Sequence, residues 1–156
     1  MIKKYPVLLL FFCLTTLFTS CDKDKIHWEK YFGYTREAVL GHYESIDDES
    51  YYGNIPTENV DLYDNVSLDV EAGSGNLTRI HVVIPDRLNK WFSGIVPLND
   101  DDFIIDMTVE GFDNYDFLAT VYKSEEGIIR LHGRVVKDLG PESNKCYGFD
   151  VIKKVE

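Results

Sequence analysis

Apolar and polar residues alternate along most of the chain after residue 66, and this two-residue period is typical of β-strands with one buried face. The alternation predicts strands over residues 66–72, 77–84, 103–110, 117–123, 128–137 and 147–155, with further short strands over 42–46 and 91–98. The apolar members of the clearest rows are expected to share one interior: Leu68, Val70, Ile80, Val82, Ile105, Met107, Val109, Phe117, Val121, Ile129, Leu131 and Val135.

Turn-forming residues separate these strands, and no long amphipathic helix is evident. The run Gly73-Ser74-Gly75-Asn76 indicates a hairpin loop, and Thr35 can cap a short helical turn over 36–40 that ends at Gly41. We therefore predict a single all-β domain over 26–156, an antiparallel meander of about seven to eight strands with a short N-terminal turn or helix. A closed barrel, a partly open barrel and a sandwich all fit this pattern.

The first twenty residues follow a different pattern. Lys3 and Lys4 precede an uncharged apolar run over 7–18, which at about twelve residues is too short to span a bilayer and is typical of a signal peptide. Thr19, Ser20 and Cys21 come next, and small residues before a cysteine at this point resemble the lipobox of bacterial lipoproteins. The resemblance implies that 1–20 is removed as a signal peptide, that Cys21 carries lipid and that 21–25 is a charged tether.

A lipidated Cys21 would hold the protein to a membrane of the bacterial cell envelope, and we expect the outer membrane, on its periplasmic or its surface face. Removal of Lys3 and Lys4 would leave 14 basic and 27 acidic residues, a formal charge of −13. Cys13 would leave with the signal peptide, so no intramolecular disulfide could form. We expect the remaining thiol, Cys146, to be a small buried apolar group.

A second, short resemblance concerns the start of the domain. The stretch Ala38-Val39-Leu40-Gly41-His42-Tyr43 resembles the opening of small lipocalin-like and calycin-like bacterial lipoproteins, in which a short turn leads to a glycine and an aromatic residue on the first barrel strand. Gly41 and Tyr43 would occupy those two places. The resemblance implies an eight-stranded antiparallel barrel with room for an interior pocket, and it supplies no ligand residues.

The charge of the whole chain narrows the classes of partner. Its 16 basic and 27 acidic residues give a formal charge of −11 and a pI near 4.7, which argues against nucleic acid as a partner because a nucleic-acid binder needs a basic surface. The membrane, reached through the N-terminal lipid, and an unidentified protein or small molecule are the partners that we expect.

Motifs of enzymes and metal sites are missing from the sequence. The four histidines have no metal-ligand spacing, and Gly73-Ser74-Gly75 fits a hairpin loop better than a hydrolase motif. Two acidic stretches, over 99–102 and 113–116, lack the alternating pattern of a calcium loop and are interpreted as solvated turns. We therefore predict no enzymatic activity, no metal and no cofactor.

Two rows of basic residues form the candidate anion or partner surface. Arg79 and His81 alternate with apolar residues on one predicted strand, and Arg130, His132 and Arg134 do so on another. Such rows can bind a carboxylate or phosphate, or they can form ion pairs with neighbouring strands.

The ion-pair alternative accounts well for the first of these rows. A five-residue loop after 66–72 would place Glu71 opposite Arg79 and Asp69 opposite His81, whereas a three-residue loop would place Asp69 opposite Arg79.

Ion pairing accounts less well for the second row, because the preceding strand offers Leu118, Thr120 and Tyr122 on the matching face. Asp106 and Glu110 could reach Arg130 and Arg134 only if the 103–110 strand lay on the other side. We therefore expect this second row, more than the first, to be the surface that binds an anion or a partner.

These observations favour a lipid-anchored, non-enzymatic binding module. An alternative is an acidic inhibitor or immunity-type lipoprotein that neutralises a basic partner such as a lysozyme or a toxin, since the net charge would attract a cationic protein. An envelope hydrolase is a third hypothesis, and the sequence selects no catalytic residues for it.

Overall fold

A computed structural model describes residues 25–47, 51, 53, 61–95, 104–109, 114–139 and 144–155. The predicted signal peptide, Cys21 and the acidic stretch over 99–102 lie outside these residues. Over 104–109 only the backbone is described, so the expected inward positions of Ile105, Met107 and Val109 also remain predictions.

The described chain is all-β apart from one helical turn. Its elements are β1 (Trp28–Lys30), α2 (Arg36–Val39), β2 (Gly41–Ser45), β3 (Ser67–Ala72), β4 (Leu77–Ile84), β5 (Leu88–Ile95), β6 (Ile104–Val109), β7 (Tyr115–Ser124), β8 (Ile129–Asp138) and β9 (Asn144–Lys153). The predicted strands all occur, and the bounds of β4 are those that the alternation predicts. The sequence pattern did not predict β1, which is only three residues long and carries no visible period.

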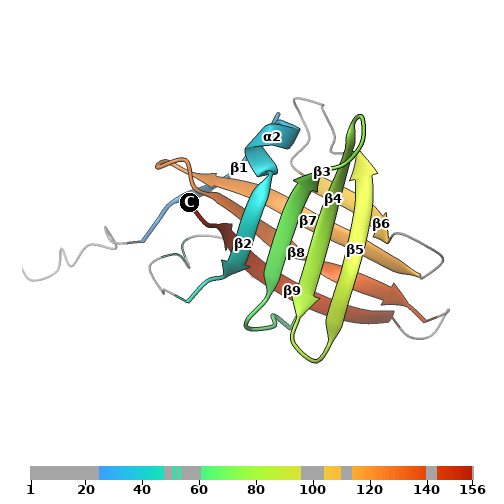
Figure 1. Cartoon of the computed structure of the whole chain (residues 1–156). Coiled ribbons are helices and arrows are strands. Elements are labelled where there is room, and N and C mark those ends of the chain that lie inside the picture. Colours follow the sequence, from blue (N-terminus) through green and yellow to red (C-terminus); the bar gives the residue numbers. More distant parts are fainter. Residues whose placement is uncertain are drawn as a thin grey trace, which may run out of the picture.

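Antiparallel pairings join each strand from β2 to β9 to the next, and β9 pairs again with β2. The ladder between β5 and β6 comprises two residue pairs, Phe92↔Val109 and Ser93↔Thr108, so the result is a partly open barrel. In Figure 1, β2–β5 cross in front of β6–β9. The short β1 pairs with the last residues of β7, next to the part of β7 that pairs with β6.

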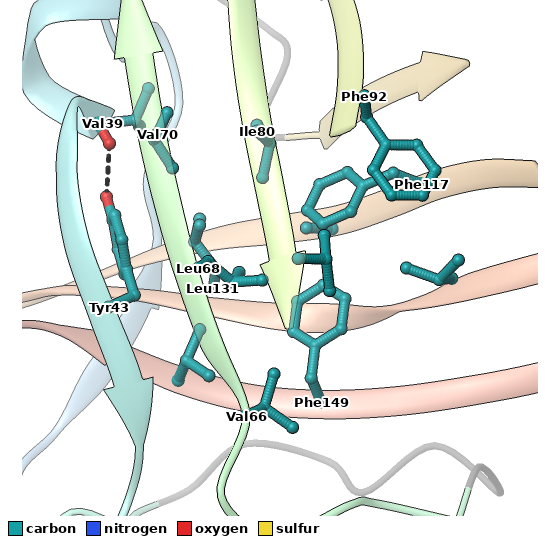
Figure 2. Packing of buried hydrophobic residues seen from close by; sticks show 14 of the residues in the cluster. Val39, Tyr43, Val66, Leu68, Val70, Ile80, Phe92, Phe117, Leu131 and Phe149 are labelled. Atoms are coloured by element: carbon teal, nitrogen blue, oxygen red, sulfur yellow. Dashed lines mark hydrogen bonds between the residues drawn. The ribbon is translucent and has the colours of Figure 1, made fainter. Parts of the chain in front are cut away.

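The interior is filled by the apolar rows that the alternation predicts. Every predicted inward residue whose side chain is described is buried: Leu68, Val70, Ile80, Val82, Phe117, Val121, Ile129, Leu131 and Val135. Figure 2 shows Phe92, Phe117 and Phe149 pointing toward one another at the centre of this core, and the rings of Phe117 and Phe149 stack with centroids 5.2 Å apart. All described members of the core cluster lie between Tyr34 and Val151.

The helix α2 closes part of one end of the barrel. The side chain of Thr35 accepts a hydrogen bond from the Ala38 amide, as predicted for a helix cap, and Val39 is buried in the core. Tyr43, also buried, donates a hydrogen bond of 2.7 Å from its hydroxyl to the Val39 carbonyl, which ties α2 to β2 (Figure 2). We call this the α2 end; β2 begins here, and β7 and β9 end here.

Candidate functional site

The basic row on β4 lies on the outer surface of the barrel beside acidic residues of β3. Glu71 pairs with Arg79 and Asp69 with His81. Of the two registers considered from the sequence, this is the one that a five-residue loop produces. Nδ1 of His81 lies 3.9 Å from Oδ2 of Asp69, and its Nε2 lies 2.7 Å from Oδ1 of Asn89. The cross-strand register that the ion-pair alternative requires is therefore present at His81.

Neighbouring strands extend this row into a network across β2–β5. The ring of Trp91 stacks on His81 with centroids 4.5 Å apart, and the guanidinium carbon of Arg79 lies 4.3 Å from the Trp91 ring. On β2, Nδ1 of His42 lies 2.6 Å from Oδ1 of Asp69, and this hydrogen bond raises the pKa of His42. Asp69 is 43% exposed, so water screens these charges and each pair contributes little to stability.

Arg130, on β8, occupies a different environment. Its side chain is 3% exposed, its Nε donates to Oδ1 of Asp150 at 2.6 Å and its Nη2 donates to Oδ2 of the same carboxylate. Burial raises the pKa of Asp150, but the hydrogen bonds from Arg130, together with the nearby His132, outweigh burial and hold that pKa below its usual range. The two-pronged pairing leaves Arg130 with a protein carboxylate as its counter-ion.

A cover formed by distant parts of the chain buries this ion pair. The ring of Trp28, from β1, lies 5.1 Å from the guanidinium carbon of Arg130. The backbone oxygen of Tyr51 accepts hydrogen bonds from Nη1 of Arg130 at 2.7 Å and from the Trp28 indole at 2.9 Å. A Cβ at Gly53 would overlap the backbone oxygen of Ile26, so only glycine allows these segments to meet so closely.

The expectation of an open basic row over Arg130, His132 and Arg134 needs correction. Arg130 is buried and paired, and His132 is buried with its Nδ1 3.5 Å from Oδ2 of Asp150. Arg134 is half-buried further along β8. The physical reason is that the counter-ion, Asp150, comes from the following strand, β9, and not from the preceding strand or from 103–110.

Asp150 is thus a residue that sequence reasoning missed. The sequence signal for it is an aspartate at an outward position of the last predicted strand. On β9 the inward residues are Tyr147, Phe149 and Val151, so Asp150 faces outward with Gly148 and Ile152. The register pairs Asp150 with His132 directly.

A groove of about 620 Å³ opens at the α2 end, between α2, the start of β2, the turn after β7 and the end of β9. Ligand sites of this size are common at the mouths of barrels. None of the described residues that line the groove is acidic, and four are lysine or histidine: His42, Lys123, Lys153 and Lys154.

Lys123 and Lys153 occupy positions that continue inward-facing rows. Phe117, Ala119 and Val121 point into the core, and Lys123 comes next in that row on β7. On β9, Lys153 follows Val151 in the same way. Each row thus ends in a lysine where the interior opens at the α2 end.

These two lysines have no carboxylate within ion-pair distance in the part of the chain that the structure describes. Nζ of Lys123 lies 4.7 Å from the centre of the Tyr31 ring, and Nζ of Lys153 donates to the Ala38 carbonyl at 3.0 Å. By contrast, Lys154 pairs with Glu44 at 2.9 Å. Lys123 and Lys153 are therefore the cations of the groove that an anion could reach.

Gly41, beside Lys153, has a backbone conformation that favours glycine. It has a φ of +140°, which L side chains rarely adopt, and a Cβ there would lie 2.8 Å from Cε of Lys153. This explains physically why a glycine begins β2, where the short resemblance places one.

Other chemistry is sparse among the described residues. No group of three or more histidine, cysteine, aspartate or glutamate side chains there could hold a metal ion. Cys146 is exposed, which corrects the expectation that it is buried, because it lies near the start of β9 and away from the core. No helix within the described ranges is both long and apolar enough to cross a membrane.

Comparisons with known proteins identify no relative. No protein-family model matches the chain, and neither the curated proteins nor the solved structures contain a match. The candidate site therefore rests on its geometry alone.

Proposed function

We propose that this chain is a lipid-anchored protein of a bacterial envelope whose barrel is a non-enzymatic binding module for a small anionic ligand. The observation that carries the binding proposal is the pair Lys123 and Lys153, which line a groove without a described acidic residue. In a chain with 27 acidic and 16 basic residues, such a cluster is a local reversal of the overall charge. An anion in the groove would supply the ion-pair partner that these two lysines do not have among the described residues.

The groove suits a ligand better than the described interior does. The core is occupied by large buried side chains, among them Tyr43, Phe92, Phe117 and Phe149. Tight packing of this kind leaves little space between side chains. The groove instead opens to solvent at the α2 end, where a ligand can reach it without displacing the core.

The lipid anchor is supported by the lipobox-like residues Thr19, Ser20 and Cys21. The described chain starts at Lys25, three residues before β1, and β1 pairs with the end of β7 at the α2 end. A tether over 21–25 can span at most about 3.3–3.6 Å per residue, or roughly 18 Å. A lipid on Cys21 would therefore keep the groove close to the membrane surface.

The binding proposal is tested by native mass spectrometry of the full chain purified from its own membranes. We expect a co-purified small anion in the wild type and its loss in the double variant Lys123→Gln/Lys153→Gln. Lys145→Gln is the matched control, because Lys145 is exposed at the opposite end of β9. An equal amount of bound anion in all three proteins, or none in the wild type, would overturn the proposal.

The anchor is tested separately by metabolic labelling with a radioactive fatty acid. The wild type should incorporate label and Cys21→Ala should not, because the substitution removes the sulfur that is acylated. Equal labelling of the two chains, or no labelling of either, would refute the lipid anchor and leave the binding proposal unaffected.

A further inference from the structure

We infer that the ligand of the groove is a single-chain amphiphile with a carboxylate or phosphate head. This inference rests on the proposed function, because it names the class of anion that the groove would take. It follows from the presence of cationic and apolar side chains in the same groove.

The cationic part can bind an anionic head directly. An ammonium group has three N–H donors, and the hydrogen bond to the Ala38 carbonyl uses one donor of Lys153. The contact of Lys123 with the Tyr31 ring is a cation–π contact, so it uses none of the N–H donors of Lys123 in a hydrogen bond to oxygen. Carboxylate and phosphate both offer several acceptor oxygens to such a pair, which is why the two heads share this chemistry.

The apolar part of the groove is unsuited to a wholly polar anion. Leu40, Ile128, Ile129 and Val155 also line the groove, and Val155 is 90% exposed. A small polar anion bound to the lysines would leave these side chains in water. An alkyl chain that covers them would gain free energy for each methylene removed from water.

His42 and Lys154 also line the groove, but they do not add to its cationic part. His42 is engaged by Asp69 and Glu44, and Lys154 by Glu44, so their charges are compensated by protein carboxylates. Lys123 and Lys153 have no ion-pair partner among the described residues, although Glu29 lies opposite Lys123 in the ladder between β1 and β7.

The test is calorimetric titration of residues 22–156, which include every described core residue, with alkyl carboxylates kept below their micelle concentrations. Circular dichroism first establishes that each protein is folded. We expect acetate to bind weakly and affinity to rise from hexanoate to decanoate by at least about tenfold, since each fully buried methylene adds roughly fourfold. Decyl phosphate should bind about as tightly as decanoate, because both heads are anionic acceptors. Decyltrimethylammonium should not bind, because its head is a cation.

Variants assign the two parts of the ligand. Lys123→Gln and Lys153→Gln should each weaken decanoate binding roughly tenfold. The two are tested separately because Lys153 also contacts the end of α2, whereas Lys123 does not. Ile128→Gln should reduce the gain from hexanoate to decanoate. Lys145→Gln and Leu139→Gln, at the other end of the barrel, are the controls and should bind like the wild type.

The outcomes separate this inference from the proposed function. Binding that does not depend on chain length would overturn the amphiphile and leave the anionic ligand in place. Binding of decyltrimethylammonium as tight as that of decanoate would overturn it as well, because the lysines would then have no role. If no anion of any length binds and none co-purifies with the full chain, both proposals fail.

Discussion

The chain contains the same short pattern twice, and the two copies have opposite fates. An arginine and a histidine two residues apart face outward on β4 as Arg79 and His81, and again on β8 as Arg130 and His132. On β4 the pair stays at the surface in a network that includes Asp69 and Trp91. On β8 the pair is buried with Asp150.

The difference lies in what covers the two faces, because both rows have a carboxylate on the adjacent strand. The described contacts around β4 come from neighbouring strands of the same sheet. The face of β8 is covered by Trp28, from β1, and by Tyr51, from the connection between β2 and β3. The outward face of a barrel strand thus becomes a second interior wherever another segment of the chain lies over it.

The largest expected effect comes from breaking the buried pair. Asp150→Ala would leave the Arg130 guanidinium buried without its counter-ion, which should lower the free energy of unfolding by roughly 3–5 kcal/mol. Asp69→Ala on the exposed network should cost less than about 1 kcal/mol. Urea unfolding of residues 22–156, followed by far-ultraviolet circular dichroism, measures both. Similar losses for the two variants would contradict the contrast between the faces.

A smaller effect is expected from the two tryptophans, one in each region. Trp28 is 2% exposed and covers Arg130, so Trp28→Ala should cost about 3 kcal/mol, the lower part of the range for a buried aromatic residue. Trp91 is half-buried and contacts His81 and Arg79 on the surface, so Trp91→Ala should cost about 1 kcal/mol. The same unfolding measurement applies, and a costlier Trp91→Ala would reverse the assignment.

The sequence predicts the strands well, but it does not predict which segments of the chain cover the outer face of β8. Local alternation predicts β4 residue by residue, because one wetted face and one buried face impose a period of two. The register Asp69↔His81 was one of two that charge pairing allowed. Trp28 and Gly53 could not be placed on the outer face of β8, since no local period records a contact between segments so distant in the sequence.

The groove could have been predicted only in part. A lysine that ends an inward apolar row, as Lys123 and Lys153 do, is a visible departure from the alternation. That the two lysines line one groove depends on the pairing of β8 with both β7 and β9, and on the position of α2. Neither follows from the pattern of a single strand.

The stability that each region contributes should also depend on pH, and in opposite directions. The lowered pKa of Asp150 means that its contribution to stability is complete above about pH 4, the usual carboxyl range, and is lost as the pH falls through the folded value. The raised pKa of His42 means that its contribution is complete below about pH 6.5 and is lost as the pH rises through the folded value. Urea midpoints measured across this range should lose the acid decline in Asp150→Asn and the alkaline decline in His42→Gln. An unchanged profile in either variant would remove that residue from the explanation.

The smallest expected effect is on the titration of His42 itself, and it examines the surface network directly. The hydrogen bond from His42 to Asp69 is the main cause of the raised pKa, with Glu44 adding to it. In a proton nuclear magnetic resonance titration, the midpoint of the His42 imidazole should lie above about 6.5 and fall in Asp69→Asn. Glu44→Gln should lower it by less, and added salt should lower it in the wild type because both carboxylates are exposed. A midpoint that is the same in wild type and Asp69→Asn would show that the network on β2–β4 does not hold the imidazolium, and the exposed row would then lack the pairing with a carboxylate that the buried row has.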